Sequence, residues 1–213
     1  MILAGDLINN NIRTSVGNPF EQTMRPRQQK RLMIEQLTPL RDRILCMVGG
    51  NHERRTTKDT DESPAYDIAC KLDLEDAYRE NAAYLKLQFG DSAGNGATNP
   101  CYTFCVTHGA GSSIYTTNAA MRVERYGMAI DGIDGIIAGH IHKPQDFPVG
   151  KIVVDKHNDR VSVKPFQVVI CTSWLQYSAF AAQKLMAPTV FSLTCLELSG
   201  KKKKMALSRQ VGY

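Results

Sequence analysis

The chain has 213 residues, of which 43% are hydrophobic and 22% charged, with a formal net charge of +5 and a pI near 8.9. These values are typical of a soluble globular protein, and the length predicts a single domain over residues 1–213 with a substantial core. The sequence has no apolar run close to the roughly 20 residues that span a bilayer, and no basic and apolar leader of the secretory type. We therefore expect no membrane partner and a cytoplasmic location, and six scattered cysteines agree with a reducing compartment.

The first half of the chain predicts alternating strands and helices. Pro26 suits the first turn of one helix, and Ser63 followed by Pro64 suits the start of another. The predicted elements are a strand ending at residue 5, a loop over 12–25, a helix over 26–37, a strand over 43–48, helical stretches over 63–74 and 75–82, and strands over 84–89 and 101–107. Glycine and asparagine between the last two strands predict that they form a hairpin.

The second half of the chain is richer in strands. The secondary structure of residues 174–185 is ambiguous from the sequence. The predicted elements are a helix over 117–129, strands over 135–138, 151–155 and 161–172, a turn over 156–159, and a final hairpin formed by 189–198 and 205–209. Lys201 to Lys204 would then lie at the tip of that hairpin. Together the two halves predict an α/β fold.

Four apolar runs end in a polar residue that could bind a metal ion or act beside one. The four segments are Gly5-Asp6, Gly50-Asn51-His52-Glu53, His108-Gly109 and Gly139-His140-Ile141-His142. The carboxyl ends of strands in an open α/β sheet converge on one crevice, so these side chains are expected to lie together. Imidazole is the commonest metal ligand in proteins, although a His-x-His pair alone is as often two unliganded loop residues. The repetition at four strand ends therefore indicates a metal centre.

These four motifs, in this order, resemble the calcineurin-like metallophosphoesterases over residues 5 to 142. The resemblance implies a four-layer α/β/β/α sandwich with two divalent metal ions at one edge of two sheets. It also implies hydrolysis of a phosphomonoester or phosphodiester, with a nucleotide or nucleic acid as one candidate substrate. Manganese is the first candidate metal, followed by iron, zinc and nickel, because mixed nitrogen and oxygen ligands suit all four.

The resemblance also implies a role for each matching residue. Asp6 corresponds to the aspartate shared by both ions, and His142 corresponds to a ligand of the second ion. The remaining ligands of the first ion are Asn51, His108 and His140. His52 corresponds to the residue that steadies the phosphoryl oxygen or protonates the leaving group, although it could instead orient its loop. Arg54 and Lys143 flank the motifs and are expected to contact substrate phosphate, with a surface role as the alternative.

One part of the family pattern is absent. The family begins with an Asp-x-His motif on a strand upstream of Gly-Asp, whereas Asp6 is the sixth residue here. The fold is therefore expected to lack its first strand, and the second ion keeps only Asp6 and His142, fewer than the usual three protein ligands. The missing part could lie upstream of Met1, could come from another polypeptide such as a second copy, or could be lost altogether. The first explanation is favoured, because residues 1–5 resemble a strand cut midway.

Two other functions remain open from the sequence. The chain could be an inactive module that binds metal or phosphate through an incomplete site. It could also bind nucleic acid through the basic stretch over residues 25–43 and the lysine run at 201–204. The simpler interpretations are a solvated helix face for the basic stretch and protection of an edge strand for the lysine run. A metal-dependent phosphoesterase is the leading hypothesis.

Overall fold

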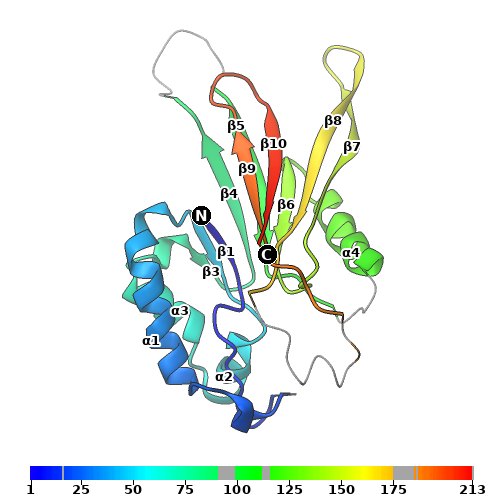
Figure 1. Ribbon diagram of the computed structural model, residues 1–213. Coiled ribbons are helices and arrows are strands. Elements are labelled where there is room, and N and C mark those ends of the chain that lie inside the picture. The colour runs from blue at the N-terminus through cyan, green and yellow to red at the C-terminus, as the bar shows by residue number, and fades with distance from the viewer. Residues whose placement is uncertain (16, 91–98, 112–115, 175–184, 186, 213) are drawn as a thin grey trace.

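The computed structural model describes residues 1–15, 17–90, 99–111, 116–174, 185 and 187–212 (Figure 1). The described α-helices are α1 (Pro26–Leu37), α2 (Glu53–Thr60), α3 (Pro64–Lys71) and α4 (Thr116–Met128). The described 3-10 helices are η1 (Pro19–Glu21), η2 (Thr38–Arg43) and η3 (Glu75–Ala77). The described strands are β1 (Ile2–Ala4), β2 (Cys46–Val48), β3 (Tyr78–Arg79), β4 (Ala82–Gln88), β5 (Cys101–Thr107), β6 (Gly135–Ala138), β7 (Gln145–Asp155), β8 (Arg160–Ile170), β9 (Ser192–Leu198) and β10 (Met205–Val211). The predicted α/β class is confirmed, and none of the described helices is long and apolar enough to cross a membrane.

The described strands form two larger sheets and a separate hairpin. One sheet is parallel, with the order β1-β2-β3. The other is mixed, with the order β4-β5-β6-β8-β7, and its strands β5, β6 and β8 are parallel to one another. Strands β9 and β10 pair only with each other. In Figure 1 the parallel strands of both sheets end toward the lower side of the molecule, so the loops that follow them share one end.

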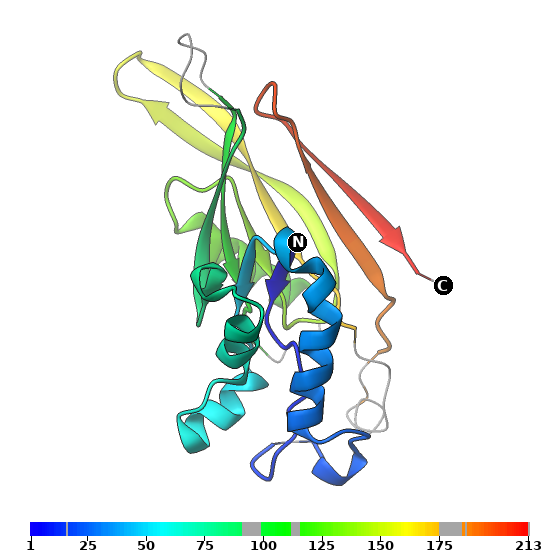
Figure 2. The same ribbon diagram turned by 90° about the vertical axis from the view of Figure 1, so that its left-hand side faces the viewer.

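Alternating residues of the strands pack into different apolar clusters. Met47 of β2 packs with residues of α1 and α3, whereas its neighbour Val48 packs between the two sheets. In the mixed sheet, Ile137 faces the other sheet and Ile136 packs with Val123 of α4. Both faces of β2 and β6 are therefore covered, which explains why these short strands are continuously apolar rather than alternating. Figure 1 shows α1 and α4 on opposite sides of the strands, and in the turned view of Figure 2 α1 lies in front.

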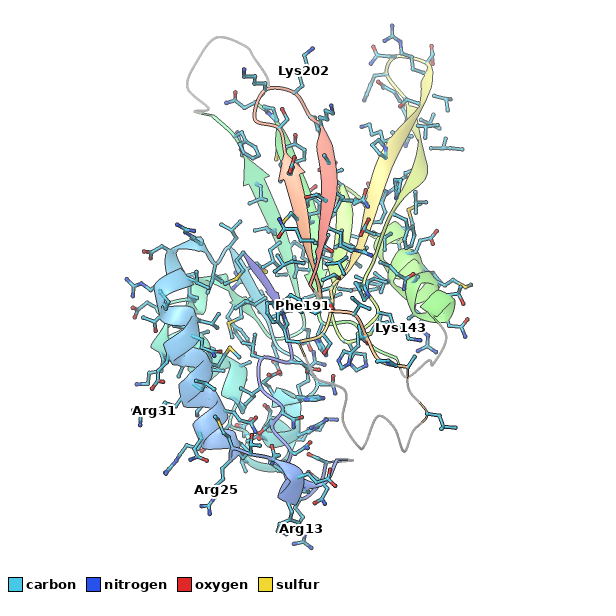
Figure 3. All side chains as sticks on the ribbon, viewed as in Figure 1. Arg13, Arg25, Arg31, Lys143, Phe191 and Lys202 are labelled. Atoms are coloured by element: carbon cyan, nitrogen blue, oxygen red, sulfur yellow. The ribbon has the colours of Figure 1, made fainter. Side chains whose placement is uncertain are left out.

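The final hairpin covers part of the space between the sheets. Leu207 of β10 packs against the cluster between them, together with Ile2 of β1. The hydroxyl of buried Tyr102 donates to the Ser199 carbonyl at 2.7 Å and accepts from the Lys204 amide at 2.9 Å. These contacts fix the turn that carries Lys201 to Lys204 at the hairpin tip, as predicted; Figure 3 labels Lys202 there.

Most predicted elements are confirmed, including both hairpins and the proline-initiated helices α1 and α3. The predicted helical stretch over 75–82 is wrong, because only η3 forms there. Tyr78 instead pairs with Met47 of β2 and is buried, so tertiary pairing overrides local helix propensity. Helix α2 was not predicted, since its almost wholly polar sequence has no apolar period. The ambiguous residues 175–184 lie outside the described part of the chain.

Candidate metal centre

Four loops deliver polar side chains to one end of the two sheets. Asp6 follows β1 and Asn51 follows β2, while His108 follows β5 and His140 follows β6. Each residue lies just beyond the carboxyl end of a parallel strand, as the sequence predicted. The structure brings all four side chains together.

Each of these four residues has a ligand atom close to that of at least one of the others. Asn51 Oδ1 is 2.8 Å from His108 Nε2 and 2.7 Å from His140 Nδ1. His108 Nε2 is also 3.1 Å from His140 Nδ1 and 3.1 Å from Asp6 Oδ2. Among the described residues, Asp6, His108 and His140 form a group whose ligand atoms all lie within 4.8 Å of each other. Figure 3 shows this end of the molecule, where Lys143 is labelled.

In His108 and His140, the ring nitrogen that points away from the cluster already has a hydrogen-bond partner. His108 Nδ1 is 2.7 Å from the Ala4 carbonyl oxygen, and His140 Nε2 is 2.7 Å from the Gly111 carbonyl oxygen. A carbonyl only accepts hydrogen bonds, so each of these nitrogens carries the proton. In the neutral rings, the inner nitrogens then present lone pairs toward the oxygens of Asp6 and Asn51. Four electron-rich atoms facing one another repel unless a cation or a proton lies between them, so this donor set fits a metal ion.

The pKa shifts of Asp6 and His108 indicate that a proton and a metal ion would compete for the same position. Burial would raise the pKa of Asp6, but the hydrogen bond with His108 and the positive charges of His52 and His108 lower it to about 2. Burial likewise works against protonation of His108, yet its hydrogen bond and charge interaction with Asp6 raise its pKa. A proton on His108 therefore occupies the position that a metal ion would take.

The backbone is strained at three of the predicted ligands. Asp6, His140 and His142 have φ angles of 52°, 63° and 58°. Residues other than glycine rarely adopt this left-handed conformation, which costs of order 1–3 kcal/mol at such sites. The tight turn that contains both histidines is closed by the Ile141 amide, which donates to the Gly139 carbonyl at 2.7 Å. Five other described non-glycine residues share this conformation, so the strained backbone supports a functional site only together with the ligand geometry.

His142 and His52 lie at the side of the four-residue cluster. His142 is half-buried; burial lowers its pKa, and the charge of Asp6 opposes that change. His52 Nε2 is 3.7 Å from Asp6 Oδ2, and the His52 amide donates to Asp6 Oδ1 at 2.9 Å. Burial lowers the pKa of His52 to about 4, despite the opposing charge of Asp6. The His52 ring is therefore neutral at neutral pH before any phosphate anion arrives.

Glu53 holds the two loops of the first sheet together, a role that the sequence reasoning missed. Its carboxylate is 1% exposed and accepts hydrogen bonds from the amides of Asp6 at 3.2 Å, Ile8 at 3.0 Å and Gly50 at 3.0 Å. These contacts join the loop after β1 to the loop after β2. The glutamate adjacent to the Asn-His pair was the only signal in the sequence, and it did not reveal the partners.

Asn10 and Arg55 tie the same loops together from the other side. Buried Asn10 donates through Nδ2 to the His52 carbonyl at 2.7 Å and to Thr56 Oγ1 at 3.0 Å. Arg55 donates through Nη1 to the Asn9 carbonyl and to Asn11 Oδ1, both at 3.0 Å. The sequence did not reveal these contacts, because the partners are more than 40 residues away.

The two predicted phosphate-binding cations are placed differently. Arg54 Nη2 lies 3.4 Å from the Gly49 carbonyl and 3.4 Å from the Glu80 carbonyl, so this guanidinium contacts backbone. Lys143 is half-buried in the loop that carries His140 and His142, at the end of the molecule where the centre lies (Figure 3). His157, to which the sequence gave no role, is exposed in the turn between β7 and β8. A phosphate contact by Arg54 or Lys143 stays a prediction.

Comparison with known proteins found no matching family profile, no matching curated protein and no matching solved structure. The interpretation of this centre therefore depends on its own geometry.

Proposed function

We propose that the protein is a metal-dependent phosphoesterase that acts on a phosphomonoester or phosphodiester. The observation that supports this most is the convergence of Asp6, Asn51, His108 and His140 from four strand ends, with neighbouring ligand atoms 2.7–3.1 Å apart. An inward-facing carboxylate, amide oxygen and two imidazoles are the mixed donors that divalent transition metals prefer. The order of the motifs along the chain agrees with the calcineurin-like metallophosphoesterases.

The residues of the chain would have separate tasks in this reaction. Asp6, Asn51, His108 and His140 would hold one divalent ion, and Asp6 with His142 would contribute to a second. Divalent ions in such a centre neutralise the phosphoryl oxygens and lower the pKa of a water nucleophile. Burial keeps the His52 ring neutral, but the negative charge of a phosphoryl group would raise its pKa again. His52 could then donate a hydrogen bond or a proton to the ester.

We infer that the architecture is the four-layer α/β/β/α sandwich of that family. Three apolar clusters support the layer order, because one lies between the first helices and the parallel sheet, one between the sheets, and one between the mixed sheet and α4. In this arrangement the metal centre lies where both sheets end. The four ligands of the first ion would then come from both sheets, two from each.

The central experiment compares metal content and turnover in matched histidine variants. His140→Asn removes an imidazole ligand while keeping a residue type that tolerates the left-handed backbone. We expect bound manganese, measured by elemental analysis, and hydrolysis of an aryl phosphate to fall together. His157→Asn, in the exposed turn, is the control and should change neither. Normal metal content in His140→Asn would remove this residue from the ligand set.

His52→Asn separates catalysis from metal binding. Manganese content should stay normal, while turnover should fall by roughly 10²–10⁴-fold, the usual contribution of a general acid or base. Loss of metal in this variant would make His52 a ligand instead. A wild-type protein that binds manganese but hydrolyses no phosphomonoester or phosphodiester would support the alternative of an inactive binding module.

A further inference from the structure

An exposed aromatic pair lies beyond the end of β8. The rings of Trp174 and Phe191 have centroids 4.4 Å apart and planes inclined by 59°. Trp174 is 75% exposed and Phe191 is 36% exposed, and the neighbouring Val190 is 59% exposed. Single apolar residues on a surface are ordinary, but a packed aromatic pair with an open face is a surface on which another ring can stack.

The sheet topology places this pair at the same end of the mixed sheet as the metal centre. Strands β6 and β8 are parallel neighbours, and the Cys171 amide extends their ladder by donating to the Ala138 carbonyl at 2.8 Å. Beyond that point, β6 continues into His140 and β8 continues into Trp174. Trp174 is three positions along the chain from Cys171, which is at most about 11 Å of extended chain. Figure 3 shows Phe191 at the same lower end of the strands as Lys143.

The pair is held by three stretches of chain that are far apart in sequence. Thr172 Oγ1 donates to the Val190 carbonyl at 3.5 Å, which connects the segments carrying the two rings. The Gly212 amide donates to the Phe191 carbonyl at 3.0 Å. A Cβ atom on Gly212 would lie 2.8 Å from Cδ1 of Phe191, so glycine allows the ring to lie against the backbone there. These contacts hold the chain around the two rings in place before any ligand binds, which reduces the entropic cost of stacking.

We propose that Trp174 and Phe191 stack against a planar ring carried by the phosphate ester, so that the substrate class is nucleotides, with the phosphate at the metal centre and the base on the aromatic pair. This inference rests on the proposed phosphoesterase function for the position of the phosphate. Stacking a base on an aromatic side chain is sequence-tolerant and typically contributes ~1–3 kcal/mol. Removal of Trp174 should then weaken binding of a nucleotide by about 5- to 150-fold.

Trp174 is the only tryptophan of the chain, so its fluorescence reports on this site alone. The full chain is titrated, at constant manganese, with non-hydrolysable phosphonate analogues of adenosine monophosphate and of ribose 5-phosphate. The adenosine analogue should quench or shift the emission and bind more tightly than the ribose analogue. Equal affinity of the two analogues would overturn the proposal. A short single-stranded DNA with phosphorothioate linkages tests whether the base comes from a polymer, and quenching by the DNA alone would assign the site to polynucleotides.

Matched variants separate stacking from general damage. In Trp174→Leu, calorimetry should show the 5- to 150-fold loss for the adenosine analogue and no change for inorganic phosphate, whereas Trp174→Phe should retain most of the affinity. Phe20→Leu is the control, because Phe20 is a 96% exposed aromatic residue on η1, outside the pair. An unchanged preference for the adenosine analogue in Trp174→Leu would overturn the assignment. If the protein binds the base but hydrolyses no phosphate ester, the stacking site is retained and the phosphoesterase function is rejected. If it hydrolyses phosphate esters at rates that do not depend on the base, the phosphoesterase function is retained and the stacking site is rejected.

Discussion

Glu53 shows how a residue outside the ligand set determines where the ligands lie. Three backbone amides donate to its two oxygens and stabilise its charge, although burial and the nearby negative charge of Asp6 raise its pKa. Hydrogen bonds to a charged group contribute about 1.5–3 kcal/mol each, more than bonds between neutral groups. Two of these amides belong to Asp6 and Gly50, which directly position the first two ligands.

Glu53→Gln should therefore destabilise the protein. Glutamine offers one oxygen in place of two, so its amide group would face a backbone N–H, most directly that of Ile8. We expect a loss of about 1.5–3 kcal/mol in the free energy of unfolding, measured by urea denaturation. Glu62→Gln, at an exposed position before α3, should change stability by no more than about 0.5 kcal/mol. Equal stability of both variants would show that the three hydrogen bonds contribute nothing net.

Metal binding should depend on pH through His108. Its pKa is raised in the folded protein, so the proton stabilises the metal-free fold below the unfolded value of 6.5, and that contribution is lost as pH rises through the raised pKa. Below the raised pKa, metal must displace this proton, and apparent affinity should fall about tenfold per pH unit. Asp6, with a pKa of about 2, stays ionised throughout. Manganese titrations from about pH 8 to about pH 6 test this, and a flat profile would contradict it.

At the scale of elements, the decisive junction is the turn from β2 into α2. Gly50 lies where the loops after β1 and β2 come into contact. A Cβ atom there would be 2.1 Å from the Asp6 amide nitrogen and 2.2 Å from Asp6 Oδ1. The junction therefore accepts only glycine without moving a ligand loop.

Gly50→Ala should displace the Asp6 loop. We expect a destabilisation of at least about 1–3 kcal/mol, because the obstructing atoms include backbone that cannot rotate away. Manganese affinity should fall as well, because Asp6 moves relative to the other ligands. Gly150→Ala in β7 is the matched control, since its nearest neighbour is the Val163 Cγ1 atom at 3.2 Å. Thermal unfolding and metal titration measure both effects, and wild-type metal affinity in Gly50→Ala would contradict this placement.

At the scale of the whole molecule, the candidate centre joins the two sheets. Asp6 and Asn51 follow strands of the parallel sheet, while His108 and His140 follow strands of the mixed sheet. An ion held by all four would connect the loops of the two sheets, which otherwise meet through apolar packing and the contact between His108 and the Ala4 carbonyl. Among the described residues, a second ion would have Asp6 and His142 as its ligands, so the two positions are unequal.

Manganese should therefore stabilise the whole fold in one dominant step. Calorimetry should show one tight site, with any second site weaker by orders of magnitude. Manganese at 100 times its dissociation constant should raise the free energy of unfolding by about 2.7 kcal/mol, and a chelator should reverse this stabilisation. His140→Asn should lose most of the stabilisation. Two equally tight sites would mean that a further residue completes the second position.

The sequence by itself determined the strand ends and the residues placed on them. Apolar runs that stop at Asp6, Asn51, His108 and His140 are local signals, and the parallel topology they predict carries those residues to one edge. The turn residues likewise predicted both hairpins and the position of the lysine run. Local propensity was wrong over residues 75–82, where pairing with β2 decided the outcome.

Only the tertiary structure decided the contacts that make these residues a centre. Glu53, Asn10 and Arg55 act through partners more than 40 residues away, and the Trp174–Phe191 pair forms between two separate segments. Periodicity and turn chemistry describe only neighbours along the chain. The direction in which a buried carboxylate or a ring finally points depends on how two sheets and their loops pack, because that packing sets which distant donors and surfaces come within reach.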